Sequence, residues 1–308
     1  MHGGDLIWEI GSGYFGCRTT DGHFSPERFA EQARDAQIRM IELKLSQGAK
    51  PGHGGMLPAA KVTPEIAAAR GVPVGMDCIS PSAHSAFATP IELMQFIAQL
   101  RQLSGGKPTG FKLCIGHPWE WFAIVKAMLA TDITPDFIVV DGAEGGTGAA
   151  PLEFSDHVGA PLQEGLLLVH NTLVGLNLRD RIRLGASGKI VSAFDIARAM
   201  ALGADWCNSA RGFMFALGCI QAQHCHTGAC PTGVPNSVCA AGDTQSSPTA
   251  TPRASAISGV TFGPGSTPPW PGLAPCDSLI SMSLTCGEVA LATNFSSLKR
   301  PCASRQPK

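Results

Sequence analysis

Short apolar runs alternate with amphipathic stretches along residues 1–234, and this pattern predicts repeated strand–helix units. Several apolar runs lead into glycine-rich segments, which are typical of the loops after strands. Phe137–Val140 is continuously apolar and rich in β-branched residues, as expected for a strand buried on both faces. The predicted strands are Leu6–Ile10, Ile38–Leu45, Gly110–Ile115, Phe137–Val140, Arg181–Leu184 and Ala204–Asn208.

Local capping signals place helices between these strands. Thr63 and Pro64 open a short helix that Gly71 closes, so an N-cap, a first-turn proline and a final glycine bracket it. Thr89 and Glu92 form a capping-box pattern before apolar residues at helical spacing. Further helices are predicted after Pro118, around Leu166–Leu176 and from Ser192 to Leu202.

These repeated units indicate a parallel α/β fold, and we expect an incomplete (β/α)8 barrel of the TIM type. About six units are present where such a barrel needs eight. Active sites of these barrels lie on the loops after the strands, and phosphate often binds after the last two. Gly185–Lys189 and Ala210–Gly212 take that place, with Lys189 and Arg211 as cations, although ordinary tight turns use the same residues.

Three cysteines, Cys219, Cys225 and Cys230, lie within twelve residues, and the last precedes a proline. Thiolates are the preferred protein ligands of iron–sulfur clusters, and closely spaced cysteines let one loop supply several of them. Three thiolates are one short of a tetrahedral zinc site or a fully ligated four-iron cube, so a three-iron cluster is the prediction. The alternatives are a buried cysteine group and a zinc site completed by His224 or His226.

Charge and composition limit the class of partner. The 308 residues carry a formal net charge of −1 and only 15% are charged, which gives no indication of nucleic acid or an acidic membrane surface. No apolar run reaches about eighteen residues and the first residues do not resemble a signal peptide, so we expect a cytoplasmic protein. The 11 scattered cysteines then favour reduced thiols and a metal site over disulfides.

Residues 235–308 differ in composition from the preceding chain. Of these 74 residues, 29 are Ser, Thr or Pro and only three are acidic, with no sustained periodicity before a short run near Leu279–Ala292. The composition predicts a disordered tail, and the abrupt change after Val234 suggests the further hypothesis of a shifted reading frame. The predicted domains are therefore a partial barrel over residues 1–234, with a cysteine loop at 218–233, and this tail.

Several motifs, in the same order over about residues 6–234, resemble the FMN-binding domain of glutamate synthase. The pattern is most similar to free-standing bacterial proteins built on that domain. The motifs are Lys44–Gly52 (KLSQGAKPG), Ile79–Pro81 with His84, Asp141–Gly148 (DGAEGGTG), Leu178–Leu184 and the Cys219–Pro231 loop. The resemblance implies a barrel that holds FMN beside a 3Fe-4S cluster.

The same resemblance implies a reaction and a set of ligands. Electrons would pass through the cluster to FMN, which reduces the imine formed from 2-oxoglutarate and ammonia. By position, Cys219, Cys225 and Cys230 would be the cluster ligands. Gln47 and Lys50 would hold the 2-oxoglutarate carboxylates, for which an amide and an ammonium are suitable donors.

Other residues correspond to the flavin site of the family. Lys112 would lie beside the flavin N1–O2 edge and stabilise negative charge on the reduced ring. The loop from Asp141 would contact the cofactor, and the loops after the last two strands would take its phosphate. The corresponding residues are Asp141, Gly145 and Gly146, and then Gly188, Lys189, Ala210, Arg211 and Gly212. Without the resemblance, Asp141 is also compatible with a cap of its loop, and Lys50, more than Lys112, with a surface lysine.

Three departures from the family pattern shape the functional expectation. The opening barrel strand has no counterpart, so we expect the chain to begin inside the domain. Residue 2 is His2, so a glutaminase domain with an N-terminal cysteine is not indicated, and no NAD(P)H-binding fingerprint is visible. Ammonia would then come from solution or from a glutaminase subunit, and electrons from an electron-donor subunit. The atypical tail also replaces the family's continuation after the cysteine loop.

We therefore expect a glutamate synthase-type oxidoreductase domain that is incomplete. One alternative is an inactive truncated remnant, or a partner subunit of such an enzyme. Another is a different FMN-dependent barrel oxidoreductase, such as a hydroxy-acid oxidase, which would place a catalytic histidine near the flavin and leave the cysteine loop without a role.

Overall fold

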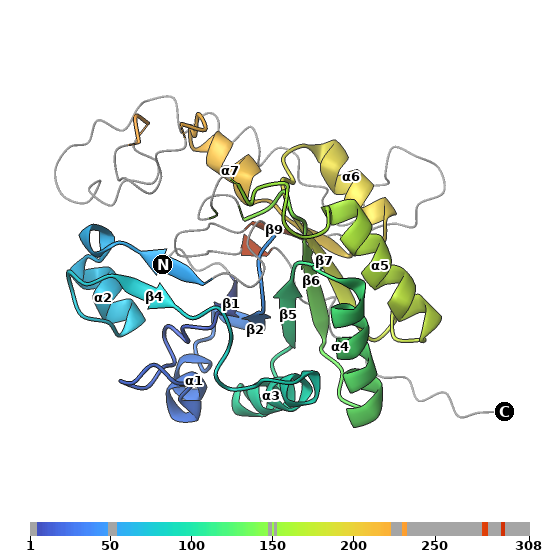
Figure 1. Cartoon of the computed structure of the whole chain (residues 1–308), viewed down its shortest axis with the longest axis horizontal. Coiled ribbons are helices and arrows are strands. Elements are labelled where there is room, and N and C mark those ends of the chain that lie inside the picture. Colours follow the sequence, from blue (N-terminus) through green and yellow to red (C-terminus); the bar gives the residue numbers. More distant parts are fainter. Residues whose placement is uncertain are drawn as a thin grey trace.

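The computed structural model describes residues 5–48, 54–146, 150, 153–222, 230–232, 279–282 and 291–292. Within these residues, one sheet has the strand order β1-β2-β5-β6-β7-β8-β9-β10 (Figure 1). Its first six strands are parallel and follow one another in chain order. They are β1 Leu6–Ile10, β2 Ile38–Lys44, β5 Thr109–Leu113, β6 Phe137–Asp141, β7 Arg183–Ser187 and β8 Trp206–Asn208. The predicted incomplete TIM-type barrel is confirmed.

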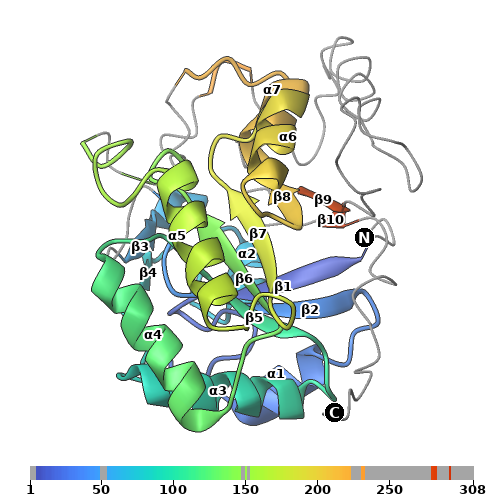
Figure 2. The same cartoon turned by 90° about the vertical axis from the view of Figure 1, so that its right-hand side faces the viewer.

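Most of the helices connect the strands and lie along the outside of the curved sheet (Figures 1 and 2). They are α1 Pro26–Gln32, α2 Pro64–Arg70, α3 Pro90–Leu103, α4 Pro118–Thr131, α5 Leu162–Gly175, α6 Ala193–Ala201 and α7 Ala210–Ala216, with a 3-10 turn at Ala59–Lys61. The predicted capping box at the start of α3 forms in both directions between Thr89 and Glu92. Gly71 ends α2 at φ 63°, where a side chain would strain the backbone.

The alternation of side chains along the strands separates two apolar layers. Ile41, Phe111 and Val140 face outward and pack into the main core with helix residues such as Ile97 and Val169. A second, smaller cluster lies on the inner face of the sheet. Its members are Ile7, Met40, Phe137, Val139 and Trp206. The inner face is therefore apolar below the carboxyl ends of the strands.

Two glycines make room for the large rings of this inner cluster. A Cβ atom on Gly110 would lie 2.7 Å from the Phe137 ring, and one on Gly185 would lie 2.6 Å from the Trp206 ring. The two rings pack in a T-shaped, edge-to-face arrangement, with centroids 5.7 Å apart. The absence of a side chain at both positions is thus a packing requirement of the inner face.

An ion pair joins β7 and β8 at their amino-terminal ends. Arg179 Nη2 lies 2.8 Å from Asp205 Oδ2, which also accepts a hydrogen bond from Leu184 N at 2.7 Å. Arg179 donates further hydrogen bonds to the carbonyl oxygens of Ile182 and Gly203. This network stabilises the end of the sheet opposite the loops that follow the strands.

The structure corrects two boundaries. β7 covers Arg183–Ser187 rather than Arg181–Leu184, because residues 185–187 pair with both β6 and β8 instead of forming a loop. Ala210–Gly212, expected as a loop, is the first turn of α7. In both cases a small residue or glycine suggested a turn, but tertiary pairing or a following helix decides the conformation.

Two elements are not indicated by the hydrophobic pattern. α1 has only seven residues, although Ser25 caps it and proline opens it. The second is a two-stranded sheet between β2 and α3, in which β3 Gly55–Leu57 and β4 Cys78–Ser80 pair antiparallel on either side of α2. Elements of three residues are too short to show a period in sequence.

Two short strands from the 235–308 segment adjoin the sheet. β9 Leu279–Met282 pairs in parallel with β8, and β10 Leu291–Ala292 pairs antiparallel with β9 and approaches β1 to within 8 Å between Cα atoms. Figure 2 shows both beside β8. They coincide with the short run near Leu279–Ala292; most of this segment lies outside the described residues, so the tail remains a prediction. Across the described part of the chain, no helix has the length and apolarity to cross a membrane.

We expect Gly110→Ala to destabilise the protein, because the new methyl group collides with the ring and main chain of Phe137. The expected loss in free energy of unfolding is about 1–3 kcal/mol or more. Gly175→Ala is the control, because nothing lies within 4 Å of the position that its Cβ atom would take, and alanine favours the helix. Urea denaturation measures both; equal stability of the two variants would contradict the packing of the inner face.

Candidate active site

A row of charged side chains lies on the inner face of the sheet, near the carboxyl ends of four strands. Glu9 comes from β1, Lys44 from β2, Lys112 from β5 and Asp141 from β6. Lys44 Nζ lies 2.7 Å from Glu9 Oε1, and Lys112 Nζ lies 3.3 Å from Glu9 Oε2. Lys112 Nζ also lies 3.8 Å from Asp141 Oδ2. We call these four side chains the charged row.

The charged row is largely removed from water. The exposed fraction of the side chain is 6% for Lys112, 13% for Glu9 and 2% for Asp141. Desolvating such ions costs several kcal/mol each unless opposite charges compensate them. Positive and negative groups alternate along the row, so each ion has an opposite neighbour and the four charges sum to zero.

Asp141 connects the charged row to the segment after β2. Its Oδ2 atom accepts a hydrogen bond from Gly48 N at 3.0 Å. Its Oδ1 atom is buried and has no hydrogen-bond partner among the described residues. Gln47 Nε2, one residue earlier, donates to the Gly146 carbonyl oxygen at 3.1 Å. Of the predicted residues, Gln47 therefore contacts Gly146 directly, and Asp141 contacts Gly48, the residue after Gln47. One oxygen of the Asp141 carboxylate can accept a further donor.

The glycines of this region allow three loops to approach one another. A Cβ atom on Gly48 would collide with the Gly142 carbonyl oxygen, and one on Gly145 would lie 2.9 Å from Gly188 Cα. Gly188 also has φ 127°, a conformation that favours glycine. The loops after β2, β6 and β7 thus pack main chain against main chain. Gly145 and Gly188, predicted as cofactor contacts, have at least this structural role.

The two predicted phosphate loops are neighbours. Ser209 Oγ donates a hydrogen bond to the Ile190 carbonyl oxygen at 2.7 Å, and a Cβ atom on Gly212 would lie 3.3 Å from the same oxygen. Lys189 has φ 47°, and its ammonium pairs with Asp156 at 2.9 Å near the surface. Ala210 and Arg211 lie beside Gly212 in the first turn of α7. The structure therefore brings residues 188–190 and 209–212 together.

The predicted cluster ligands are only partly described. Cys219 follows α7, is half-buried, and its amide donates to the Met214 carbonyl oxygen at 3.0 Å. Cys230 is also half-buried. Cys225 and Lys50 lie outside the described residues. No group of three potential metal ligands occurs among the residues that the structure does describe, so the three-thiolate set remains a prediction.

Two other cysteines near the strand ends are unreactive. Burial raises the pKa of the Cys114 thiol to about 12, with a further contribution from the Asp141 carboxylate. Burial also raises the pKa of Cys207 to about 12. Both therefore remain protonated at neutral pH, whereas nucleophiles and metal ligands require the thiolate.

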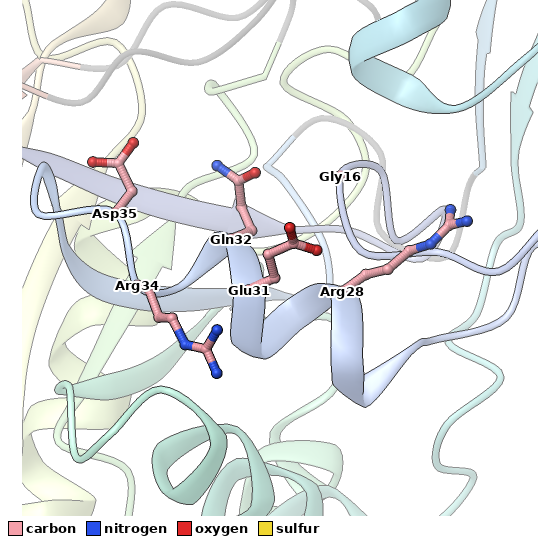
Figure 3. Close-up of a pocket in the computed structure, with 6 residues that line it drawn as sticks. All are labelled: Gly16, Arg28, Glu31, Gln32, Arg34 and Asp35. Carbon is pink, nitrogen blue, oxygen red and sulfur yellow. The ribbon is translucent and has the colours of Figure 1, made fainter.

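A surface hollow of about 580 Å³ lies apart from this site. Figure 3 shows that its side chains project mainly from α1 and the turn after it. The lining residues are Gly16, Arg28, Glu31, Gln32, Arg34 and Asp35. α1 lies on the outer side of β1, where Phe29 stacks on Trp8 with ring centroids 5.3 Å apart. The hollow therefore does not open onto the charged row.

The family comparison agrees with this architecture. The family model described as a conserved region in glutamate synthase matches residues 2–239. This chain belongs to the glutamate synthase family. The resemblance predicted from the sequence motifs is confirmed.

Two relatives show how much of a family member is present. The chain is 46% identical over 232 residues to the glutamate synthase large subunit-like protein YerD of Bacillus subtilis (strain 168), covering 75% of this chain and 44% of that protein. It is 41% identical over 195 residues to the archaeal glutamate synthase (NADPH) of Methanocaldococcus jannaschii, covering 63% and 38%. The chain therefore spans less than half the length of these relatives.

Among solved structures, a mandelate oxidase mutant with an FMN adduct aligns with 69% of this chain and 49% of its own. The sequence identity is 21% and the TM-score is 0.37.

The sequence analysis did not identify two members of the charged row as site residues. Glu9 is the single charge of the strand Leu6–Ile10, and Lys44 ends the strand Ile38–Lys44, which also carries Arg39 and Glu42. A charge on the inward-facing alternation of a predicted barrel strand is the signal that identifies them, because such a position must be paired. Lys112 carries the same signal and was predicted.

We expect Glu9→Gln to destabilise the protein by roughly 2–3 kcal/mol, because two ammonium groups lose the carboxylate between them. Lys189→Ala removes an ion pair whose side chains are 47% and 52% exposed, and its expected effect is about 0–1 kcal/mol. Thermal and urea denaturation compare the two. A Glu9→Gln variant as stable as Lys189→Ala would show that the charged row does not contribute to stability.

Proposed function

We propose that this chain is the flavin and iron–sulfur part of an oxidoreductase that reduces the imine of 2-oxoglutarate and ammonia to glutamate. The observation that carries the proposal is the buried Lys112 ammonium at the carboxyl ends of an incomplete parallel barrel. Relatives named as glutamate synthases support the reaction. Because the chain spans less than half of their length, ammonia and electrons are proposed to come from other domains or partner subunits.

The donor set of the site fits FMN as the cofactor. The buried Asp141 Oδ1 atom, which lacks a partner among the described residues, can accept a hydrogen bond from a hydroxyl group of the ribityl chain. Lys112 presents a positive group on the same inner face. Residues 188–190 and 209–212, which lie together, offer main-chain amides for a phosphate, with Lys189 and Arg211 as nearby cations. FMN bound here would supply hydride to the imine carbon.

The side chains of this chain would bind and orient the reactants. Lys112 would favour negative charge at the flavin edge, because its ammonium is held in place by Glu9 and Asp141. Gln47 and Lys50 are proposed to hold the 2-oxoglutarate carboxylates. Gln47 already lies at the mouth of the inner face, where its amide contacts the Gly146 carbonyl oxygen. On substrate binding, the Gln47 amide would donate to a 2-oxoglutarate carboxylate instead of to the Gly146 carbonyl oxygen.

A 3Fe-4S cluster is proposed on Cys219, Cys225 and Cys230, because three soft thiolates on one loop match its ligand requirement. The loop begins directly after α7, the helix that contributes Gly212 to the proposed phosphate site. Bound there, the cluster would supply electrons one at a time to a flavin on the same side of the sheet.

Anaerobic purification of the full chain tests the cofactors. We expect flavin absorbance together with iron and acid-labile sulfide near a three-iron stoichiometry. Cys225→Ser should reduce the iron content to background while the helical circular dichroism is retained, and Cys302→Ser, in the tail, should change neither. Unchanged iron in Cys225→Ser would remove this residue from the ligand set.

Flavin content, measured in the same experiment, distinguishes the glutamate synthase-type domain from the alternative functions. Lys112→Met should weaken FMN binding or lower the reduction potential of bound FMN, because the positive charge beside the ring is lost. Flavin without iron would favour a different FMN-dependent barrel, such as a hydroxy-acid oxidase. Protein that folds but binds neither group would favour an inactive remnant or a partner subunit.

A further inference from the structure

His84 connects three segments that are distant in sequence, and no role follows for it from the proposed function. It precedes α3, in a segment whose other residues are mostly exposed. Its ring lies between Tyr14, at a centroid distance of 5.4 Å, and Phe87, at 4.9 Å. Tyr14 is fully buried in the loop after β1 and has φ 48°, so its neighbours must hold an unfavourable backbone conformation.

The hydrogen bonds of His84 fix its tautomer. Nε2 lies 2.8 Å from the Lys44 carbonyl oxygen, which can only accept, so Nε2 must carry a proton. Nδ1 lies 3.1 Å from the Tyr14 hydroxyl, which in turn accepts from Ala86 N at 3.1 Å. In a neutral ring Nδ1 accepts the Tyr14 proton, and every donor in this network has one acceptor. Burial lowers the pKa of His84, in agreement with a neutral ring.

At the Lys44 carbonyl oxygen, a side chain from outside the barrel strands and the loops after them contacts the end of β2. The next residues are fixed from the β5 and β6 side: Leu45 N donates to the Lys112 carbonyl oxygen at 2.9 Å, and Gly48 N donates to Asp141. Ser46 Oγ accepts from Cys114 N at 2.8 Å. Residues 44–48 therefore lie between His84 on one side and the site strands on the other.

We infer that His84 is a positioning residue that fixes the end of β2 through a hydrogen bond from Nε2 to the Lys44 carbonyl oxygen. The bond sets where the Lys44 side chain enters the charged row and where Gln47 and Gly48 meet the β6 loop. The consequence for catalysis rests on the proposed function, whereas the positioning itself concerns only this chain's residues. Aromatic packing alone would not require a nitrogen at Nε2.

Three substitutions of His84 separate hydrogen bonding from packing. His84→Gln places an amide donor near Nε2 and retains the bond to Lys44. His84→Asn places an acceptor near Nδ1, so it retains the hydrogen bond with the Tyr14 hydroxyl and loses the one to the Lys44 carbonyl oxygen. His84→Phe retains only the ring. Asp205→Asn, which weakens the ion pair at the opposite end of the sheet, is the control for general loss of stability.

Hydrogen–deuterium exchange of the full chain, followed by mass spectrometry, measures the effect on peptides covering residues 41–48. We expect exchange there to become about fivefold faster or more in the Asn and Phe variants, since one hydrogen bond is lost. The Gln variant should exchange at nearly the wild-type rate. Asp205→Asn should leave the ratio of exchange in 41–48 to that in the rest of the barrel unchanged.

Nitrogen-15 spectra of the wild-type His84 ring provide a second measurement that needs no variant. They should show a neutral ring protonated at Nε2. A ring protonated at Nδ1, or an Asn variant that protects residues 41–48 as well as the Gln variant, would overturn the inference. Neither measurement requires flavin, iron or turnover, so these results are independent of whether the proposed function holds.

Discussion

The alternation of charge between Glu9, Lys112 and Asp141 is the constraint on which the site depends. Each of these side chains is mostly or fully buried, and none is tolerable there without an opposite charge beside it. They come from β1, β5 and β6, so the pairing also fixes how these strands are arranged around the inner face. A hydrophobic replacement would satisfy packing, but it would remove charged groups that the inner face presents to a ligand.

The loops around the charged row obey a second constraint, which is close main-chain contact. Gly48, Gly142, Gly145 and Gly188 bring the loops after β2, β6 and β7 together without side chains between them. The Asp141 carboxylate then reaches Gly48 N across the junction. Glycines that suggest ligand binding in the sequence are thus also required for the packing of these loops. Asp141 Oδ1 remains available to accept a hydrogen bond from a ligand.

The sequence predicts most of the fold because buried parallel strands and capped helices carry local signals. Phe137–Val140 and the Thr89–Glu92 box are examples in which pattern and structure agree. The site is predicted less completely, because its geometry depends on contacts between distant strands. Nothing local to Glu9 indicates that it bridges Lys44 and Lys112, and nothing local to Ser209 indicates that its hydroxyl contacts the Ile190 carbonyl oxygen.

The neutral balance of the charged row also bears on how a negative ligand is recognised. Lys112 is compensated by two carboxylates, so the row offers an oriented ammonium rather than a net positive field. Binding of an anion then depends on direction, because the ammonium is already desolvated and fixed, and little reorganisation remains to oppose the contact. The proposed phosphate-site cations, Lys189 and Arg211, lie outside the row, and the Lys189 ammonium is itself paired with Asp156. Lys112 on the inner face would orient a ligand, while Lys189 and Arg211 lie at the rim. This arrangement suits a ligand whose phosphate lies far from its reactive ring.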